Sequence, residues 1–296
     1  MGERSILAPA LIACCLAQLG AAQPENLCYA FLRSKDVHVT CGGKSDQITH
    51  RGNVDQFAIS EEQAYLGFVT SLITMRTATA ADAVYTTSLV DLGSGKLVQK
   101  TEQVGDVNHV VSTCGGIFRA FDPTRDRSGT VDLITGARVE MPPYRWFVCS
   151  SDRKVVFGSL GPLSGEGGLY EGMPPVSRAP ALPRYNAYSY NISPDGSKIA
   201  YETGSSPLCV LTSSAPPQCA GEALGETFKL SVNNAGEVLI VERDPKGGYV
   251  GIGFWKPGPK SLQIVEPHGD APQWISPATA DLLRNWSAQQ GEKSAK

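Results

Sequence analysis

The sequence has 296 residues, of which 42% are hydrophobic and 19% charged, and its formal net charge is −3. Its 31 glycines and 20 prolines fall short of the share typical of low-complexity disorder, and the hydrophobic content is sufficient for a buried core. The nearly balanced charge argues against nucleic acid or an anionic membrane as the main partner. The length is compatible with one large β domain or with two average domains.

The N-terminus predicts export. An uncharged run begins at Ser5, and its most apolar part, Ile6–Leu19, spans 14 residues, fewer than the roughly 20 that a membrane-spanning helix needs. The small residues Gly20–Ala22 predict a signal peptide, residues 1–22, cleaved after Ala22. An alternative stays open, because Leu11–Cys14 resembles a lipobox that would make Cys14 a lipidated N-terminus. Both interpretations predict export with no transmembrane segment after processing. The first gives a periplasmic or secreted chain, and the alternative gives a lipoprotein anchored at Cys14.

Cysteine usage agrees with export. Beyond the signal peptide the chain keeps Cys28, Cys41, Cys114, Cys149, Cys209 and Cys219, an even number that predicts disulfides. A hairpin turning at Ser34–Asp36 places Cys28 close to Cys41, and a turn over 213–217 does the same for Cys209 and Cys219. Elimination then pairs Cys114 with Cys149. The competing interpretation, a zinc site, lacks a Cys-x-x-Cys pair and clustered histidines.

A strand–turn–strand unit is the most informative part of the sequence. In Tyr190–Tyr201, Pro194, Asp195 and Gly196 have the backbone preferences of a tight turn, and the flanking residues favour strands. Weaker copies recur along the chain and can be marked by Ser60, Ser112, Ser150, Ser193, Asn233 and Ser276, at intervals of 38 to 52 residues. This period is near the roughly 40–50 residues of a four-stranded propeller blade.

A second turn repeats out of phase with the first. An apolar–Asp–Leu run stands before a Ser/Thr–Gly turn in Leu89–Val98 and again in Thr130–Val139. This pattern suits the hairpin between the outer strands of a blade. Two different hairpin turns in each period predict antiparallel sheets of about four strands.

The segment Ser193–Gly196 with its flanking strands resembles the WD-like repeat of TolB-type β-propellers. The match is loose at Phe147–Asp152 and Leu230–Gly236, so the spacing, more than the motif, extends the resemblance over residues 27–276. The resemblance implies an all-β ring of blades about a central channel, closed by strands from both chain ends. A β-sandwich is the competing fold, but a sandwich has no reason to repeat one turn at a nearly constant period.

Six markers predict a six-bladed propeller domain over residues 23–276, followed by a C-terminal helix and tail over 277–296. In the five-bladed alternative, Ser276 instead serves only as the N-cap of that helix, with Pro277 in its first turn. From Gln289 onward we expect a frayed tail.

No catalytic motif stands out. Gly-x-Ser-x-Gly is absent, and Gly93–Lys96 lacks the earlier glycine of a phosphate-binding loop. The polar residues best placed for a central site precede the predicted innermost strands, and these ligand-face candidates are Asn53, Asp55, Asn108 and Asn186. The Gly/Pro-rich insertion Gly161–Pro183 is either a cover for one face of the ring or a tolerated surface excursion.

The sequence therefore predicts an exported, monomeric, non-catalytic binding or scaffold protein of the cell envelope or the cell exterior. Its expected partner is a protein, a glycan or an envelope component, with no nucleic acid and no cofactor. The alternative is a metal-assisted hydrolase or lactonase, in which carboxylate and amide oxygens hold Ca²⁺ at the central channel. Such an enzyme requires Asn and Asp or Glu side chains that converge on one ion, with oxygens about 2.3–2.6 Å from it.

Overall fold

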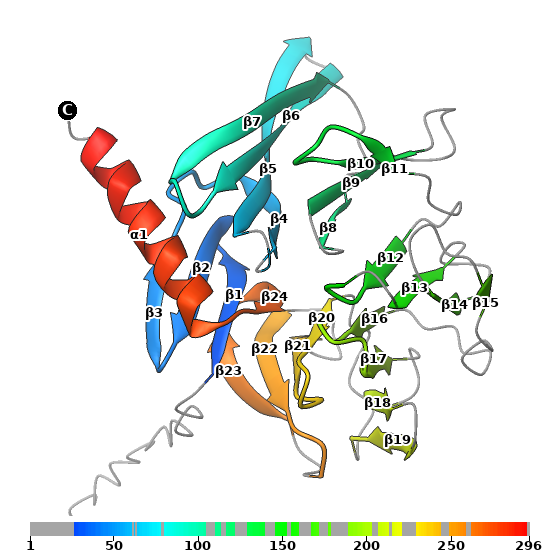
Figure 1. The fold of residues 1–296 in the computed structure, drawn as a ribbon. Helices are drawn as coiled ribbons and strands as arrows, with labels where there is room; N and C mark the ends of the chain where they lie inside the picture. Colours follow the sequence, from blue (N-terminus) through cyan, green and yellow to red (C-terminus); the bar gives the residue numbers. More distant parts are fainter. Residues whose placement is uncertain are drawn as a thin grey trace, which may run out of the picture.

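The structure is a computed structural model, and it describes residues 27–60, 62, 64–77, 80–104, 110–113, 117–121, 129–139, 146–152, 155–159, 167–171, 177–178, 189–202, 207–212, 215–220, 229–243, 249–258 and 262–294. Figure 1 shows separate small sheets and a helix at the C-terminal end. The predicted signal peptide and the alternative anchor Cys14 lie outside the described residues.

In this part of the chain the strands form six four-stranded antiparallel sheets, which confirms the expected mostly-β fold. The first sheet has the order β24 (Asp270–Trp274), β1 (Cys28–Arg33), β2 (Asp36–Cys41), β3 (Lys44–Gln47). The second has the order β4 (Val54–Ser60), β5 (Tyr65–Thr77), β6 (Ala80–Asp91), β7 (Lys96–Val104), and the third β8 (Val110–Thr113), β9 (Ile117–Phe121), β10 (Gly129–Asp132), β11 (Arg138–Val139).

The other three sheets follow the same plan. They are β12 (Trp146–Cys149), β13 (Val155–Ser159), β14 (Gly167–Glu171), β15 (Ser177–Arg178); then β16 (Ser189–Ile192), β17 (Lys198–Glu202), β18 (Cys209–Thr212), β19 (Ala215–Cys219); and last β20 (Leu230–Val232), β21 (Val238–Arg243), β22 (Tyr249–Trp255), β23 (Gln263–Pro267).

One strand of each sheet faces its neighbours. Strands β4, β8, β12, β16 and β20, the first of their sheets in chain order, contact one another in sequence, and β24 contacts both β20 and β4. We call these six the inner strands. The opposite edge of each sheet is formed by β3, β7, β11, β15, β19 or β23, which we call the outer strands.

The turn that follows the inner strand β16 has the hydrogen bonds and the glycine expected from the sequence. The N–H of Ser193 donates to the carbonyl of Lys198 at 2.9 Å, and Gly196 closes the turn with a φ of 73°. The turn after β20 repeats this arrangement. The backbone N–H of Asn233 donates to the carbonyl of Glu237 at 3.0 Å, and Gly236 has a φ of 83°. Because glycine adopts positive φ at little cost, it occupies the same position in both turns.

The second predicted turn also joins the expected strands. The Oδ1 atom of Asp91 accepts from the N–H groups of Gly93 and Ser94 at 2.8 and 3.1 Å. Asp132 does the same for Ile134 and Thr135, at 2.8 and 3.2 Å. These turns connect β6 to β7 and β10 to β11, so they lie between the two outermost strands of their sheets.

Two predicted disulfides are present. Cys28 stands directly opposite Cys41 in the β1–β2 register, and Cys209 opposite Cys219 in the β18–β19 register, and each pair is bonded. Cys149 is also disulfide-bonded, whereas Cys114, the partner that elimination predicts, lies outside the described residues.

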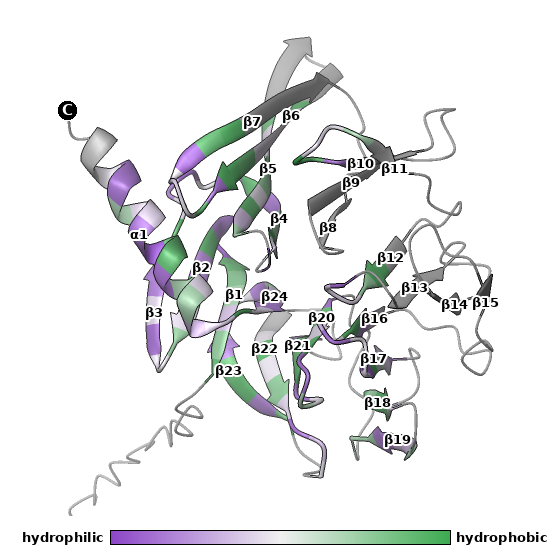
Figure 2. Ribbon diagram, viewed as in Figure 1, coloured by the Kyte–Doolittle hydropathy of each residue, from purple (hydrophilic) through white to green (hydrophobic). Residues whose placement is uncertain are grey.

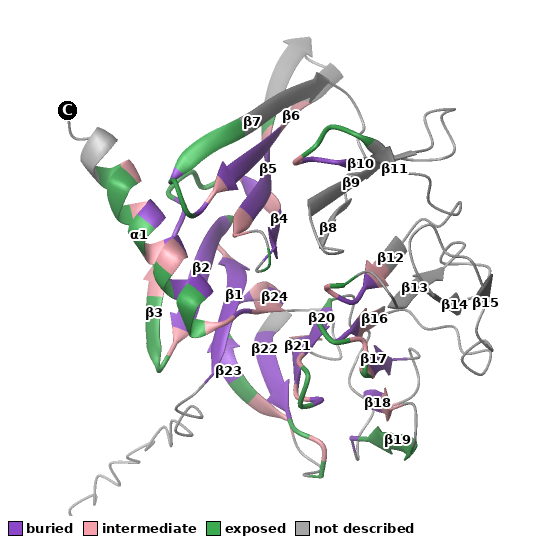
Figure 3. Cartoon of the chain, in the orientation of Figure 1, coloured by how far each residue is buried: buried purple, intermediate pink, exposed green. Residues whose placement is uncertain are grey.

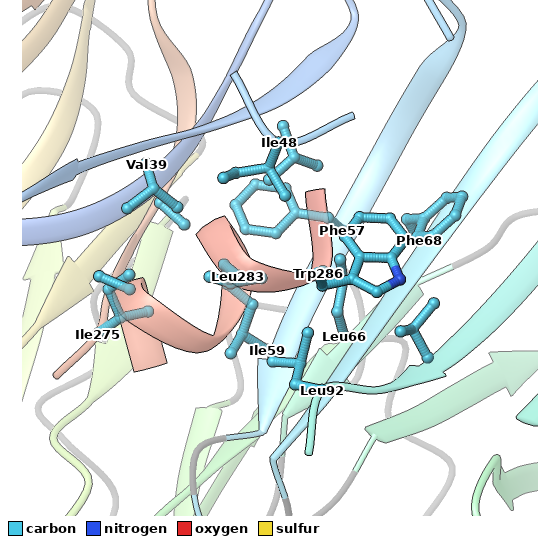
Figure 4. Close-up of a cluster of buried hydrophobic side chains, with 14 of the residues drawn as sticks. Val39, Ile48, Phe57, Ile59, Leu66, Phe68, Leu92, Ile275, Leu283 and Trp286 are labelled. Atoms are coloured by element: carbon cyan, nitrogen blue, oxygen red, sulfur yellow. The ribbon is translucent and has the colours of Figure 1, made fainter. Parts of the chain in front are cut away.

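The helix α1 (Pro277–Ser294) completes the largest hydrophobic cluster. Ser276 accepts from the N–H of Thr279 at 3.2 Å and so caps the helix, the role expected of it in the five-bladed alternative. Leu283 and Trp286 are buried among side chains of the first two sheets, and the Trp286 ring lies 6.4 Å from that of Phe68 (Figure 4). The expected frayed tail is wrong up to Ser294, because the helix formers around Gly291 outweigh the roughly 1 kcal/mol cost of one glycine.

Candidate functional site

A cavity of about 730 Å³ opens where the sheet β20–β23 meets the sheet β24–β1–β2–β3. Its lining comes from segments far apart in the sequence: Leu27, Cys28, Pro194, Asn233, Asn234, Ala235, Glu237, Phe254, Lys256, Trp274, Ile275, Ser276 and Pro277. The turns that leave the inner strands β16 and β20 therefore form part of the rim, together with the start of α1.

The turn after β20 presents its polar groups in a fixed arrangement. The side-chain oxygen of Asn233 accepts from the N–H groups of Ala235 and Glu237, at 3.0 and 2.9 Å. Its amide nitrogen donates to the Glu237 carboxylate at 2.9 Å. The other oxygen of that carboxylate lies 3.5 Å from the ammonium of Lys256, whose side chain is 64% exposed. This ion pair is the charged part of the rim.

Hydrogen bonds between successive turns fix the rim further. Asp195 donates its N–H to the side-chain oxygen of Asn234 at 3.0 Å, which joins the turn after β16 to the turn after β20. In the same way, the N–H of Ser151 donates to the carbonyl of Pro194 at 2.7 Å. These bonds place turns from neighbouring sheets side by side at one end of the inner strands.

Two aromatic side chains form the apolar wall. The rings of Phe254 and Trp274 meet edge to face, with their centroids 6.2 Å apart. The indole N–H of Trp274 donates to the carbonyl of Ser231 at 3.1 Å, and its backbone N–H donates to the Ser231 hydroxyl at 3.2 Å. Both the ring and the backbone of Trp274 are therefore fixed to Ser231.

The cavity combines apolar surface with a few oriented polar groups, which is the usual composition of a binding site. Among the residues that the structure describes, no three His, Cys, Asp or Glu side chains come together in a group that could hold a metal ion. The described residues therefore supply no set of metal ligands for the alternative, a metal-assisted enzyme.

The predicted ligand-face candidates lie elsewhere. Asn53 directly precedes β4, and its amide nitrogen donates to the carbonyl of Ser71 at 3.1 Å, while its side-chain oxygen is buried without a hydrogen-bond partner. Asp55 was expected just before the strand but lies inside β4, where the register with β5 shifts between Val54 and Gln56. This irregularity leaves Asp55 without a partner residue on β5, and its carboxylate lies 3.1 Å from the ammonium of Lys35.

Asn108 and Asn186, the other two candidates, lie outside the described residues, as does most of the insertion Gly161–Pro183. Asn53 stands before an inner strand, whereas Pro194 and Asn233 stand after one. The predicted face and the cavity are therefore at opposite ends of the inner strands.

The sequence did not predict this cavity. The sequence placed Asp195 and Asn233 in the repeated turns, with no binding role. The turn role is correct, and both turns follow inner strands and form part of the rim of the cavity. The available signal was the repeated marker itself, because Ser193 and Asn233 both follow an inner strand directly.

No family model matches the chain, and no curated protein matches it. Among solved structures, a chain of the mitotic checkpoint complex is similar at 12% identity and a TM-score of 0.48, over 83% of this chain and 81% of that one. Pyrococcus horikoshii acylaminoacyl peptidase matches at 9% identity and a TM-score of 0.44, over 78% of this chain and 42% of that one. Hsv2 of Kluyvelomyces marxianus matches at 10% identity and a TM-score of 0.41, over 71% of this chain and 60% of that one.

Proposed function

We propose that the chain is a six-bladed propeller of the WD-like type that acts as a non-catalytic binding protein. The ring is supported by the contacts of the inner strands, each of which touches two others, with β24 between β20 and β4. Closure is supported by the pairing of β24 with β1, since this sheet unites segments from the two ends of the described chain. Each blade then buries its apolar faces against its neighbours.

The proposed binding role rests on the hydrogen bonds that already order the polar groups of the cavity. Both polar atoms of the Asn233 side chain, the oxygen of Asn234 and the indole nitrogen of Trp274 are hydrogen-bonded within the chain. A rim that is already ordered binds a partner without a large entropic cost. The edge-to-face aromatic pair and the neighbouring ion pair suit a protein segment or a glycan, both of which present apolar and polar groups together.

The opposite end of the ring is a second candidate surface. Asn53 and Asp55 lie there, and the sequence pattern assigns Asn108 and Asn186 to the same side. The oxygen of Asn53 supports this candidate, because it is buried without a hydrogen-bond partner and a ligand donor that reached it would satisfy it.

Export is part of the proposal. The disulfides Cys28–Cys41 and Cys209–Cys219 fit an oxidising compartment such as the periplasm or the exterior. No helix in the described ranges is long and apolar enough to cross a membrane. Mass spectrometry of the native protein distinguishes the two processing routes: an N-terminus at Gln23 indicates signal-peptide cleavage, and a lipidated Cys14 indicates an anchor.

The binding role can be tested by capture from the solubilised native envelope fraction and on a glycan array. Ala235 is exposed at the rim, so Ala235→Tyr fills the opening without disturbing the core. The matched control is Ala288→Tyr, an equal change at an exposed position of α1. We expect wild type and Ala288→Tyr to retain the same ligand and Ala235→Tyr to lose it. Loss in Asp55→Ala alone would move the site to the opposite face, and no specific retention by wild type would overturn the proposal.

A further inference from the structure

Within the described part of the chain, β7 is the edge strand of its sheet, and the apolar side chains at its start are exposed. Among the described residues the exposed large hydrophobic side chains are Leu72, Leu97, Val98 and Ile264, and all but the last belong to the sheet β4–β7. Leu97 is 54% and Val98 50% exposed. The described start of β7 is hydrophobic in Figure 2 and exposed in Figure 3. An edge of this kind pairs readily with another strand.

The strand register connects these residues in one row. Leu72 on β5 stands opposite Val84 on β6, and Val84 stands opposite Val104 on β7. Because residues opposite one another share a face of the sheet, these three aliphatic residues form a row that ends at the free edge. At the other end of β7 the register shifts between Leu89 and Val90, which leaves Val98 without a partner residue on β6.

The sequence of β7, Lys96-Leu-Val-Gln-Lys-Thr-Glu-Gln-Val104, is complementary to itself when it is reversed about Thr101. In an antiparallel pair centred there, Lys100 stands opposite Glu102 of the second strand, twice by symmetry. Gln99 then meets Gln103, and Val98 meets Val104. Opposite charges and aliphatic pairs in directly opposed positions stabilise antiparallel strands, whereas like charges destabilise them.

We propose that two copies of this chain associate through their β7 strands, paired antiparallel about a two-fold axis at Thr101. The two sheets β4–β7 then become one sheet of eight strands. Val98 of each copy then extends the row Leu72–Val84–Val104 of the other, so the association covers Val98 at the edge of the sheet. This inference is independent of the proposed binding role and replaces the expectation of a monomer.

The chemistry of the strand favours a second copy over another protein, because every opposed position from 98 to 104 meets a suitable residue of the same sequence. Such a symmetric contact closes on itself and does not propagate. One pair of strands buries less than the roughly 800 Å² per partner of a standard interface. The dimer is therefore weak and forms as the concentration rises.

The test exchanges the central charges and follows sedimentation velocity over a concentration series. Lys100→Glu and Glu102→Lys each place like charges opposite one another, so each raises the dimer dissociation constant on the order of tenfold. The double variant Lys100→Glu/Glu102→Lys restores opposite charges and the dimer. Glu62→Lys, the same change at an exposed position off the strand, is the control and leaves dimerisation unchanged. A monomeric wild type, or a double variant as weak as the single ones, overturns the proposal.

A cysteine at the axis gives an independent readout. Thr101→Cys places two thiols opposite each other, and we expect a disulfide-linked dimer on a non-reducing gel. Ser45→Cys, exposed on the outer strand β3, is the matched control and stays monomeric. Equal cross-linking of the two variants would show random collision and would overturn the assignment to β7.

Discussion

Asp36 and Thr49 join the first hairpin to the segment that enters the second sheet. The Thr49 hydroxyl donates to Oδ1 of Asp36 at 2.7 Å, and both side chains are buried. The N–H groups of Arg51 and Gly52 donate to the same carboxylate at 2.8 and 3.1 Å. This one carboxylate therefore fixes the path of the chain just before Asn53.

Replacing Asp36 with alanine leaves the buried Thr49 hydroxyl and the N–H groups of Arg51 and Gly52 without this acceptor. We expect a loss of about 2–3 kcal/mol in the free energy of unfolding, measured by urea denaturation. Asp55→Ala is the control, since the Lys35–Asp55 ion pair is exposed and its loss changes stability by about 0.5 kcal/mol or less. Equal effects of the two substitutions would show that Asp36 has no special structural role.

The Ser193–Asp195 contact predicts a loss of stability in acid. Burial alone would raise the pKa of Asp195, but hydrogen bonds from the Ser193 hydroxyl at 2.6 Å and from the Ser197 N–H at 2.9 Å outweigh it and lower the pKa. A lowered pKa contributes stability above the usual value of 3.8, and this contribution disappears as the pH falls through the folded-state pKa.

We therefore expect Asp195→Ala to be less stable than wild type at neutral pH and to approach it as the pH falls below about 4. Chemical denaturation at a series of pH values measures the difference. A difference that stays constant over the whole series would contradict the assigned pKa direction.

Glu242 is expected to make stability depend on pH in the opposite direction. Burial on β21 raises the pKa of this carboxyl, so the folded chain keeps the proton at a pH where the unfolded chain has released it. Stability is then highest below the usual pKa of 4.5 and declines as the pH rises through the raised value. Glu242→Gln removes the cost of burying the charge, so its advantage over wild type grows with pH and then levels off.

Glu242 is a cleaner test than Glu266. Burial raises the pKa of Glu266 as well, but Arg33, 3.0 Å away, lowers it in part, and a substitution there also breaks the ion pair. If Glu242→Gln is destabilising at neutral pH, the carboxylate makes a stabilising contact in the folded chain. The predicted direction of the pH dependence is then wrong.

Trp286 anchors α1 to the body of the protein. It is only 5% exposed and shares a hydrophobic cluster with Phe57, Leu66 and Phe68. Trp286→Ala leaves a large cavity, so we expect thermal and urea unfolding to report a loss of about 3–5 kcal/mol. Asn285→Ala, an exposed neighbour on the same helix, should lie within about 0.5 kcal/mol of wild type.

The disulfide Cys209–Cys219 closes a loop with a sequence separation of 10. Loop-closure entropy alone gives it about 3 kcal/mol of stabilisation, so Cys209→Ala/Cys219→Ala should unfold at a lower urea concentration. Alkylation of the oxidised wild type under denaturing conditions should label neither cysteine. Labelling of both would show that the bond is absent from the purified protein.

Local chemistry made some of the fold predictable. The turn at Ser193–Gly196 depends on backbone preferences of consecutive residues, and the disulfide Cys28–Cys41 depends on a short hairpin whose two strands are adjacent in sequence. The outer turn of Asp91 was predictable for the same reason, since the carboxylate bonds only to residues that follow it.

The cavity was not predictable, because its shape depends on contacts between distant parts of the chain. Leu27 and Trp274 meet there only once β24 has paired with β1. The length of β5 and β6 was also missed. The stretch between Thr70 and Ser88 is rich in Thr and Ala, which give little alternation of polar and apolar residues.

The pairing of β1 with β24 has a consequence for biogenesis. A ribosome releases the β1–β2 hairpin long before the strand that completes its sheet, so the hairpin must wait, with one edge unsatisfied, while every other sheet is synthesised. The bond between Cys28 and Cys41 lies within that early hairpin and can hold it together during the delay.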